Sequence, residues 1–142
     1  MTSRQQSLEQ ERAADAWNAI IDVKENRKDI EKKYKPLAAG SAADIQINGL
    51  GQTLAFWLAK ANSKKPKPQY STLYKHVSDW VAKRLGQEGI PIPNKDLLEW
   101  LISTANTEQY RRATAEASAY LLWLKRFAEG HLEGELNERG DE

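Results

Sequence analysis

Residues 48–60 read Asn-Gly-Leu-Gly-Gln-Thr-Leu-Ala-Phe-Trp-Leu-Ala-Lys, and this stretch indicates the fold more clearly than any other part of the chain. Its second half is helical, because apolar side chains recur every three or four residues and fall on one helix face. These residues are Leu50, Leu54, Trp57, Leu58 and Ala61. Gly49 is well placed to end a preceding helix, since glycine takes the left-handed C′ conformation without a Cβ penalty. The stretch therefore predicts two helices joined by a short turn.

The rest of the chain shows the same periodicity, so we expect an all-α fold, a single-domain bundle of about six helices with no sheet. The expected helices cover residues 2–33, 36–48, 50–61, 70–85, 95–105 and 107–130. Arg27 interrupts the apolar stripe of the first helix. Pro36 suits the first turn of the second helix, where its missing N–H would have no partner anyway. A later start, with a capping box of Ser41 and Asp44, is the alternative.

Capping residues, glycines and prolines set the expected helix ends. Two prolines among lysines predict a loop over residues 62–69. Asn94 is a good N-cap for the fifth helix, because its side chain can accept a hydrogen bond from a first-turn amide. We expect Thr107 to cap the sixth helix and Gly130 to end it.

Length and charge divide the chain into two expected parts. At 142 residues it has the length of one domain. We expect a helical bundle domain over residues 1–130 and an acidic, disordered tail over 131–142. From Glu129 onward there are six acids and one arginine, so the preceding residues carry 20 bases and 14 acids, a formal charge of +6. No acidic residue lies between Asp44 and Asp79. A basic body with an acidic tail indicates a polyanionic partner.

Several classes of site lack the residues that they need. The chain has no cysteine, which excludes disulfides and thiolate metal sites. Of its two histidines, His76 has no second ligand at metal-binding spacing. Asp79 follows it by three residues, which favours a surface hydrogen bond over a catalytic pair. We therefore expect no enzyme, no metal and no cofactor. No apolar run has the length of a bilayer span and no signal-like segment opens the chain, so we expect a cytoplasmic protein.

The sequence Gly49-Leu50-Gly51 invites comparison with phosphate-binding loops. The dinucleotide-binding fingerprint needs a third glycine, and Leu54 occupies that position. No strand is expected before the motif. We interpret the glycines as a tight helix–helix joint that allows close backbone approach. Phosphate binding by the amides of Gln52 and Thr53, at a helix N-terminus, is the lesser alternative.

Two segments of the sequence are considered together. One is the Gly-Leu-Gly-Gln joint, and the other is the long last helix, which contains Tyr110-Arg111-Arg112-Ala113-Thr114 and Tyr120-Leu121-Leu122-Trp123-Leu124-Lys125-Arg126. Together these segments resemble the small subunit of the Cmr-type (type III-B) CRISPR–Cas effector complex, over residues 8–130. The resemblance implies a small helical protein of antiviral defence without a catalytic centre. Its implied partners are the backbone and large subunits, neighbouring small subunits, and the guide and target RNA. It implies neither a membrane nor a small-molecule substrate.

Two basic clusters are the candidates for sequence-independent contact with an RNA backbone. They are Lys60, Lys64, Lys65 and Lys67 around the proline-containing loop, and Arg111 and Arg112 on the last helix. Ion pairs with Glu108 and Glu116 are the alternative role of the two arginines. Lys125 and Arg126 are explained by the helix dipole, which favours cations at a C-terminus.

A second apolar strip on the last helix includes Ala119, Leu122 and Trp123. Either this helix is the central one of the bundle, or the strip is a protein-interaction surface. We favour the central helix. The alternative function for the whole chain is a helical protein-interaction adaptor without nucleic-acid contact.

Overall fold

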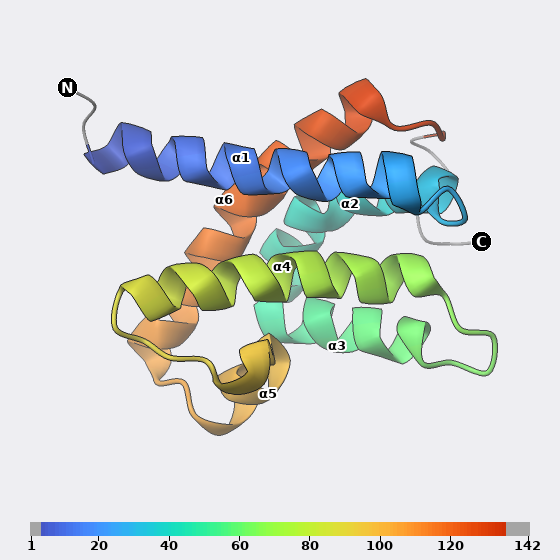
Figure 1. Ribbon diagram of the computed structural model, residues 1–142. Coiled ribbons are helices and arrows are strands. Elements are labelled where there is room, and N and C mark those ends of the chain that lie inside the picture. The colour runs from blue at the N-terminus through green and yellow to red at the C-terminus, as the bar shows by residue number, and fades with distance from the viewer. Residues whose placement is uncertain (1–3, 136–142) are drawn as a thin grey trace.

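The computed structural model describes residues 4–135, and within them it contains six α-helices and no strand (Figure 1). The helices are α1 (Arg4–Asn26), α2 (Glu31–Asn48), α3 (Leu50–Ala61), α4 (Pro68–Gln87), α5 (Leu97–Ser103) and α6 (Thr107–His131). A short 3-10 turn, Pro93–Lys95, precedes α5. The expected all-α fold is confirmed for this part of the chain. The division into bundle and tail stays a prediction, because residues 136–142 lie outside the described range.

Helix α6 is the central element of the bundle. It packs against α1, α2 and α4, and Figure 1 shows it crossing behind α1 and α4. Its inward-facing side chains are fully buried: Ala113, Glu116, Ala117, Tyr120, Leu121, Leu124 and Ala128. Helix α3 packs against α2, α4 and α5. No helix of the described residues is long and apolar enough to cross a bilayer. The structure thus agrees with the interpretation of the last helix as the central one.

The boundary between the first two helices lies earlier than predicted. The sequence predicted one helix over residues 2–33, whereas α1 ends at Asn26 and α2 begins at Glu31. The side chain of Arg27 holds the intervening turn, because it pairs with Asp29 at 3.1 Å and donates to the Thr72 hydroxyl of α4 at 3.1 Å. Pro36 consequently lies inside α2 rather than in its first turn.

Helix α5 starts later than predicted. The expected N-cap, Asn94, has a φ of 58°, which belongs to the left-handed region and not to an N-cap. Asp96 caps the helix instead, and its carboxylate accepts a hydrogen bond from the Glu99 amide at 3.2 Å. Ile102, which lies in the last turn of this helix, is 73% exposed.

Helix α6 is capped one residue before the predicted position. The Asn106 side chain accepts from the Gln109 amide at 2.8 Å, and the Gln109 side chain accepts from the Asn106 amide at 3.0 Å. This reciprocal arrangement is a capping box, so Thr107 is the first helical residue and not the cap. At its other end the helix continues through Gly130 to His131.

A buried carboxylate lies at the centre of the bundle. Glu116 is fully buried, and its two oxygens accept hydrogen bonds from Arg12 Nε at 2.5 Å and Arg12 Nη2 at 2.9 Å. Trp80 Nε1 donates to the same carboxylate at 2.9 Å, and Arg112 Nη2 donates at 2.8 Å. Arg112 also pairs with Glu88. One carboxylate therefore joins α1, α4 and α6.

This environment changes the acidity of Glu116. Burial by itself would raise the pKa of this carboxyl group, because it disfavours the charged form. The hydrogen bonds from Arg12, Trp80 and Arg112 outweigh burial and lower the pKa from 4.5 to about 2. Glu116 therefore stays ionised at neutral pH.

Replacing Leu121 by alanine should lower the free energy of unfolding by roughly 2–5 kcal/mol, because the fully buried side chain would leave a cavity. The neighbouring Leu122 is 51% exposed and provides a matched control. Leu122→Ala should change stability by no more than about 0.5 kcal/mol. Urea denaturation followed by circular dichroism measures both. Equal losses for the two variants would contradict the packing of α6 described above.

Replacing Glu116 by alanine should lower the free energy of unfolding by up to roughly 3–5 kcal/mol, because it removes the buried acceptor of Arg12 and Trp80 and leaves Arg12 with Glu9 as its remaining carboxylate partner. Folding lowers the pKa of Glu116, so its stabilisation is complete above pH 4.5 and is lost as the pH falls toward 2. Glu116→Gln should therefore flatten the loss of stability between these pH values. Glu108→Ala, which removes an exposed partner of Arg111, should leave the melting temperature nearly unchanged. A pH profile of Glu116→Gln that parallels the unmodified protein would rule out this role.

Candidate nucleic-acid interface

The lysine loop is defined as the connection over residues 62–67 together with Lys60. Its other lysines are Lys64, Lys65 and Lys67. Lys64 and Lys65 are exposed, while Lys60 and Lys67 are partly buried. The side chain of Ser63 contacts two backbone carbonyls within this segment. The Ser63 hydroxyl lies 3.0 Å from the Lys60 carbonyl and 2.9 Å from the Lys65 carbonyl. The loop therefore presents its cations from an anchored backbone.

An aromatic side chain lies beside the lysine loop. Phe56 on α3 is 52% exposed. The Nζ atom of Lys60 lies 5.4 Å from the centre of its ring, and the buried ring of Tyr70 meets it edge-on at 6.0 Å. Phe56 was not among the residues predicted from the sequence. The signal was present, because this residue falls outside the apolar face formed by Leu54 and Trp57.

The two arginines of α6 already have carboxylate partners. Arg111 is highly exposed and pairs with Glu108 at 3.1 Å. Arg112 is mostly buried, and its guanidinium pairs with Glu88 and with Glu116 at 2.8 Å. The ion pairs considered as the alternative role of these arginines are thus present, although Glu108 precedes Arg111 by three residues.

The six candidate cations do not form one surface. Figure 1 shows the α3–α4 loop and the beginning of α6 at opposite ends of the molecule. The lysine loop groups Lys60, Lys64, Lys65 and Lys67, whereas Arg111 and Arg112 lie far from it. RNA contact by either group stays a prediction.

The apolar strip on α6 lies on the partly open side of this helix. Leu122 is 51% exposed, and Ala119 and Trp123 are half-buried. The Trp123 ring packs on Phe127 with ring centres 5.6 Å apart, and Trp17 of α1 meets Phe127 edge-on at 5.3 Å. The strip is therefore the exposed margin of a packed aromatic cluster, and its use by a partner stays a prediction.

The structure shows why glycine occupies positions 49 and 51 of the joint between α2 and α3. Gly49 has φ 85° and ψ 159°, so the predicted positive φ is present, but ψ lies outside the left-handed helical region. This combination is essentially restricted to glycine. The Gly51 amide donates to the Tyr110 hydroxyl at 2.8 Å, and a Cβ at Gly51 would lie 2.8 Å from the same oxygen. The joint thus brings α3 close to α6. The Thr53 amide donates to the Gly49 carbonyl at 3.2 Å, and phosphate binding by the Gln52 amide stays a prediction.

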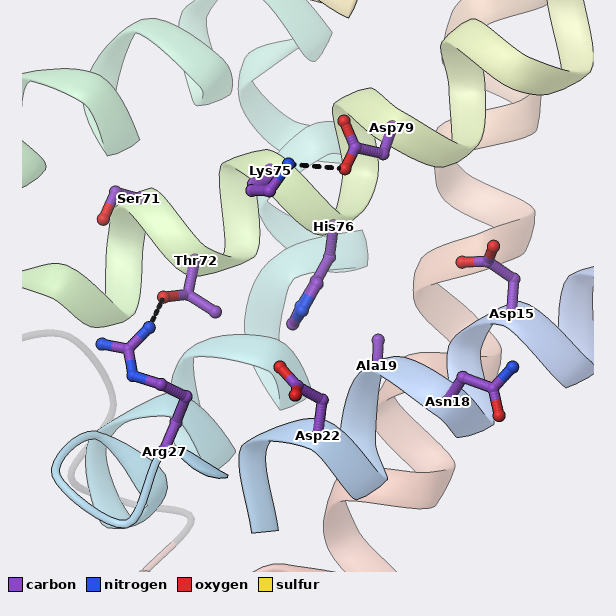
Figure 2. A pocket seen from close by; sticks show the side chains of 10 residues that line it. All are labelled: Asp15, Asn18, Ala19, Asp22, Arg27, Ser71, Thr72, Lys75, His76 and Asp79. Carbon is purple, nitrogen blue, oxygen red and sulfur yellow. Dashed lines mark hydrogen bonds and ion pairs between the residues drawn. The ribbon is translucent and has the colours of Figure 1, made fainter. Parts of the chain in front are cut away.

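A polar groove of about 580 Å³ lies between α1 and α4. Figure 2 shows His76 pointing from α4 toward Asp22 of α1. The Nδ1 atom of His76 lies 2.7 Å from the Tyr34 hydroxyl, and Asp79 pairs with Lys75 at 2.9 Å. The expected hydrogen bond between His76 and Asp79 was therefore wrong. Burial lowers the pKa of His76 to about 4, so the ring is neutral near pH 7. Among residues 4–135, no group of three or more potential ligands is arranged to hold a metal ion.

The described residues define a small helical protein whose distinctive surface is a cationic loop. Residues 8–131 match the family model described as "CRISPR-associated protein (Cas_Cmr5)", and the chain belongs to this family. Members of the family are the small subunit of the type III-B Cmr complex. The match covers nearly the same residues as the resemblance noted from the sequence, which is thereby confirmed.

Replacing Gly49 by alanine should lower the free energy of unfolding by roughly 1–3 kcal/mol, because alanine disfavours this backbone conformation. A Cβ at Gly49 would meet no atom within 4 Å, so any loss of stability in Gly49→Ala comes from the backbone conformation and not from a steric clash. Gly86 lies inside α4 with equally open surroundings. Gly86→Ala should raise stability by at most about 1 kcal/mol. Thermal denaturation distinguishes the variants, and a melting temperature of Gly49→Ala at or above that of the unmodified chain would refute the assignment.

Proposed function

We propose that this chain is a non-catalytic small subunit that scaffolds the type III-B effector complex and contacts the backbone of guide or target RNA without sequence specificity. Membership of the Cmr5 family supports assembly with other Cmr subunits. The RNA contact is argued from the chain's own surface.

The observation that carries the RNA contact is the lysine loop. Lys64 and Lys65 are exposed on an anchored loop, within a sequence interval that contains no acidic residue from Ile45 to Ser78. Lysine binds phosphate as a compact point charge and reads no base edge. Such a surface suits a complex in which base pairing with the guide supplies the sequence specificity.

Two further surfaces complete the proposal. A second, weaker RNA contact is proposed for Arg111 and Arg112. Arg111 would contribute most of it, because the guanidinium of Arg112 is held by Glu88 and Glu116. The strip of Ala119, Leu122 and Trp123 is proposed to contact a backbone subunit, a large subunit or a neighbouring small subunit. Leu122, which at 51% is the most exposed of the three, would anchor such a contact.

The second candidate function is a protein-interaction adaptor without nucleic-acid contact. The apolar strip of α6 favours this alternative, because the 51% exposed Leu122 lies next to the half-buried Trp123, and contiguous exposed apolar area marks protein contacts. The adaptor function and the RNA-binding function differ in one measurable respect. If the chain is only an adaptor, the lysine loop does not contribute to the RNA affinity of the complex or to the salt dependence of that affinity.

Replacing Lys64, Lys65 and Lys67 by glutamate should weaken binding of target RNA by the assembled complex equally for all target sequences. The slope of log affinity against log salt should flatten by up to about 2, since each single-strand phosphate contact contributes about 0.7. Fluorescence anisotropy at several salt concentrations measures both effects.

The matched control replaces Lys83, Lys95 and Lys125 by glutamate, which changes the net charge equally at positions away from the loop. It should leave the slope unchanged. If the loop variant enters the complex and the complex holds RNA as tightly as before at every salt concentration, the RNA proposal fails and the adaptor function is favoured.

A further inference from the structure

We infer that Phe56 is a stacking site for one nucleobase of single-stranded RNA beside the lysine loop. This inference rests on the proposed RNA contact and deepens it, because stacking on a base is a different interaction from binding a phosphate. Proteins that bind single strands without sequence preference combine cationic grooves with aromatic side chains on which bases stack.

The ring of Phe56 is both accessible and held in place. It is 52% exposed, and the buried ring of Tyr70 meets it edge-on with an interplanar angle of 81°. Tyr70 lies in the first turn of α4, directly after the lysine loop, and its amide donates to the Lys67 carbonyl at 3.0 Å. The platform and the loop are therefore parts of one anchored structure.

The outward face of α3 leaves room around the ring. Gln52, Ala55 and Ala59 are exposed at the neighbouring helical positions, and none carries a charge. Alanine side chains do not rise above the helix surface, so a planar ligand can approach Phe56 across them. Solvent-facing helix positions usually carry polar or charged residues, and here the interval has lysines but no acid.

Lys60 occupies a position that a base can take. Its Nζ atom lies 5.4 Å from the ring centre of Phe56, within the range of a cation–π contact. At an exposed site such a contact is weaker than base–aromatic stacking. A stacked base therefore displaces the ammonium group, which stays on the same helix within reach of the adjoining phosphate.

A protein partner fits this site less well than RNA. The exposed apolar area is a single ring flanked by alanines, whereas specific protein interfaces bury several hundred Å² on each side. A protein docked here would also have to neutralise Lys60 and the exposed Lys64 and Lys65. Single-stranded RNA supplies both a planar base and the opposite charge.

The test compares Phe56→Ala, Phe56→Trp and the unmodified chain within the assembled complex. The probes are a single-stranded RNA that is not complementary to the guide and an abasic oligomer of the same length. Phe56→Ala should lower RNA affinity at least about fivefold without changing the salt slope, because stacking releases no counterions. Affinity for the abasic oligomer should not change. Phe56→Trp should restore binding, and RNA should quench its added tryptophan fluorescence. Ile102→Ala, which removes an exposed side chain on α5, is the control and should have no effect.

Three results would overturn the inference. They are an unchanged RNA affinity for Phe56→Ala, an equal loss of affinity for RNA and the abasic oligomer, and failure of folded Phe56→Ala to enter the complex. The glutamate variant of the lysine loop separates this inference from the proposed function. If that variant weakens binding and Phe56→Ala does not, phosphate contact stands without stacking. If the loop variant has no effect, the proposed function itself fails.

Discussion

A buried carboxylate must have partners, and this requirement at Glu116 organises the bundle. Desolvating an unpaired charge is far more unfavourable than losing an ordinary hydrogen bond, so Arg12, Trp80 and Arg112 have to converge on one point. They come from α1, α4 and α6, which fixes the relative positions of these three helices. The apolar core supplies most of the burial, while the hydrogen bonds to Glu116 link α1, α4 and α6.

The proposed RNA-contacting end is built on that centre. Helix α4 contributes Trp80 to the buried network and Tyr70 to the support of Phe56, so a single rigid element connects the core with the lysine loop. Helix α3 is tied to α6 separately, through the hydrogen bond from the Gly51 amide to Tyr110. Both ends of the loop thus emerge from fixed helices, and the loop side chains themselves take no part in the buried network.

The sequence predicted the number and kind of helices well, because apolar periodicity reflects which face each helix buries. It was less successful where local signals compete. Asn94 and Asp96 are both acceptable caps, and the backbone conformation of Asn94 decided between them. The break after Asn26 depends on contacts of Arg27 with α4, which no local pattern contains. Glu116 looked like a local partner of Arg112, whereas its bond to Arg12 spans 104 positions of the chain. Phe56 could have been found from its position outside the apolar stripe.

The central claim is that the end of the molecule formed by α3 and the lysine loop faces RNA in the assembled complex. Ultraviolet crosslinking of the RNA-bound complex, with crosslinked peptides identified by mass spectrometry, tests it most directly. We expect nucleotide adducts on peptides that contain residues 56–67. Adducts confined to other parts of the chain, or a loop found crosslinked only to neighbouring protein subunits, would contradict it.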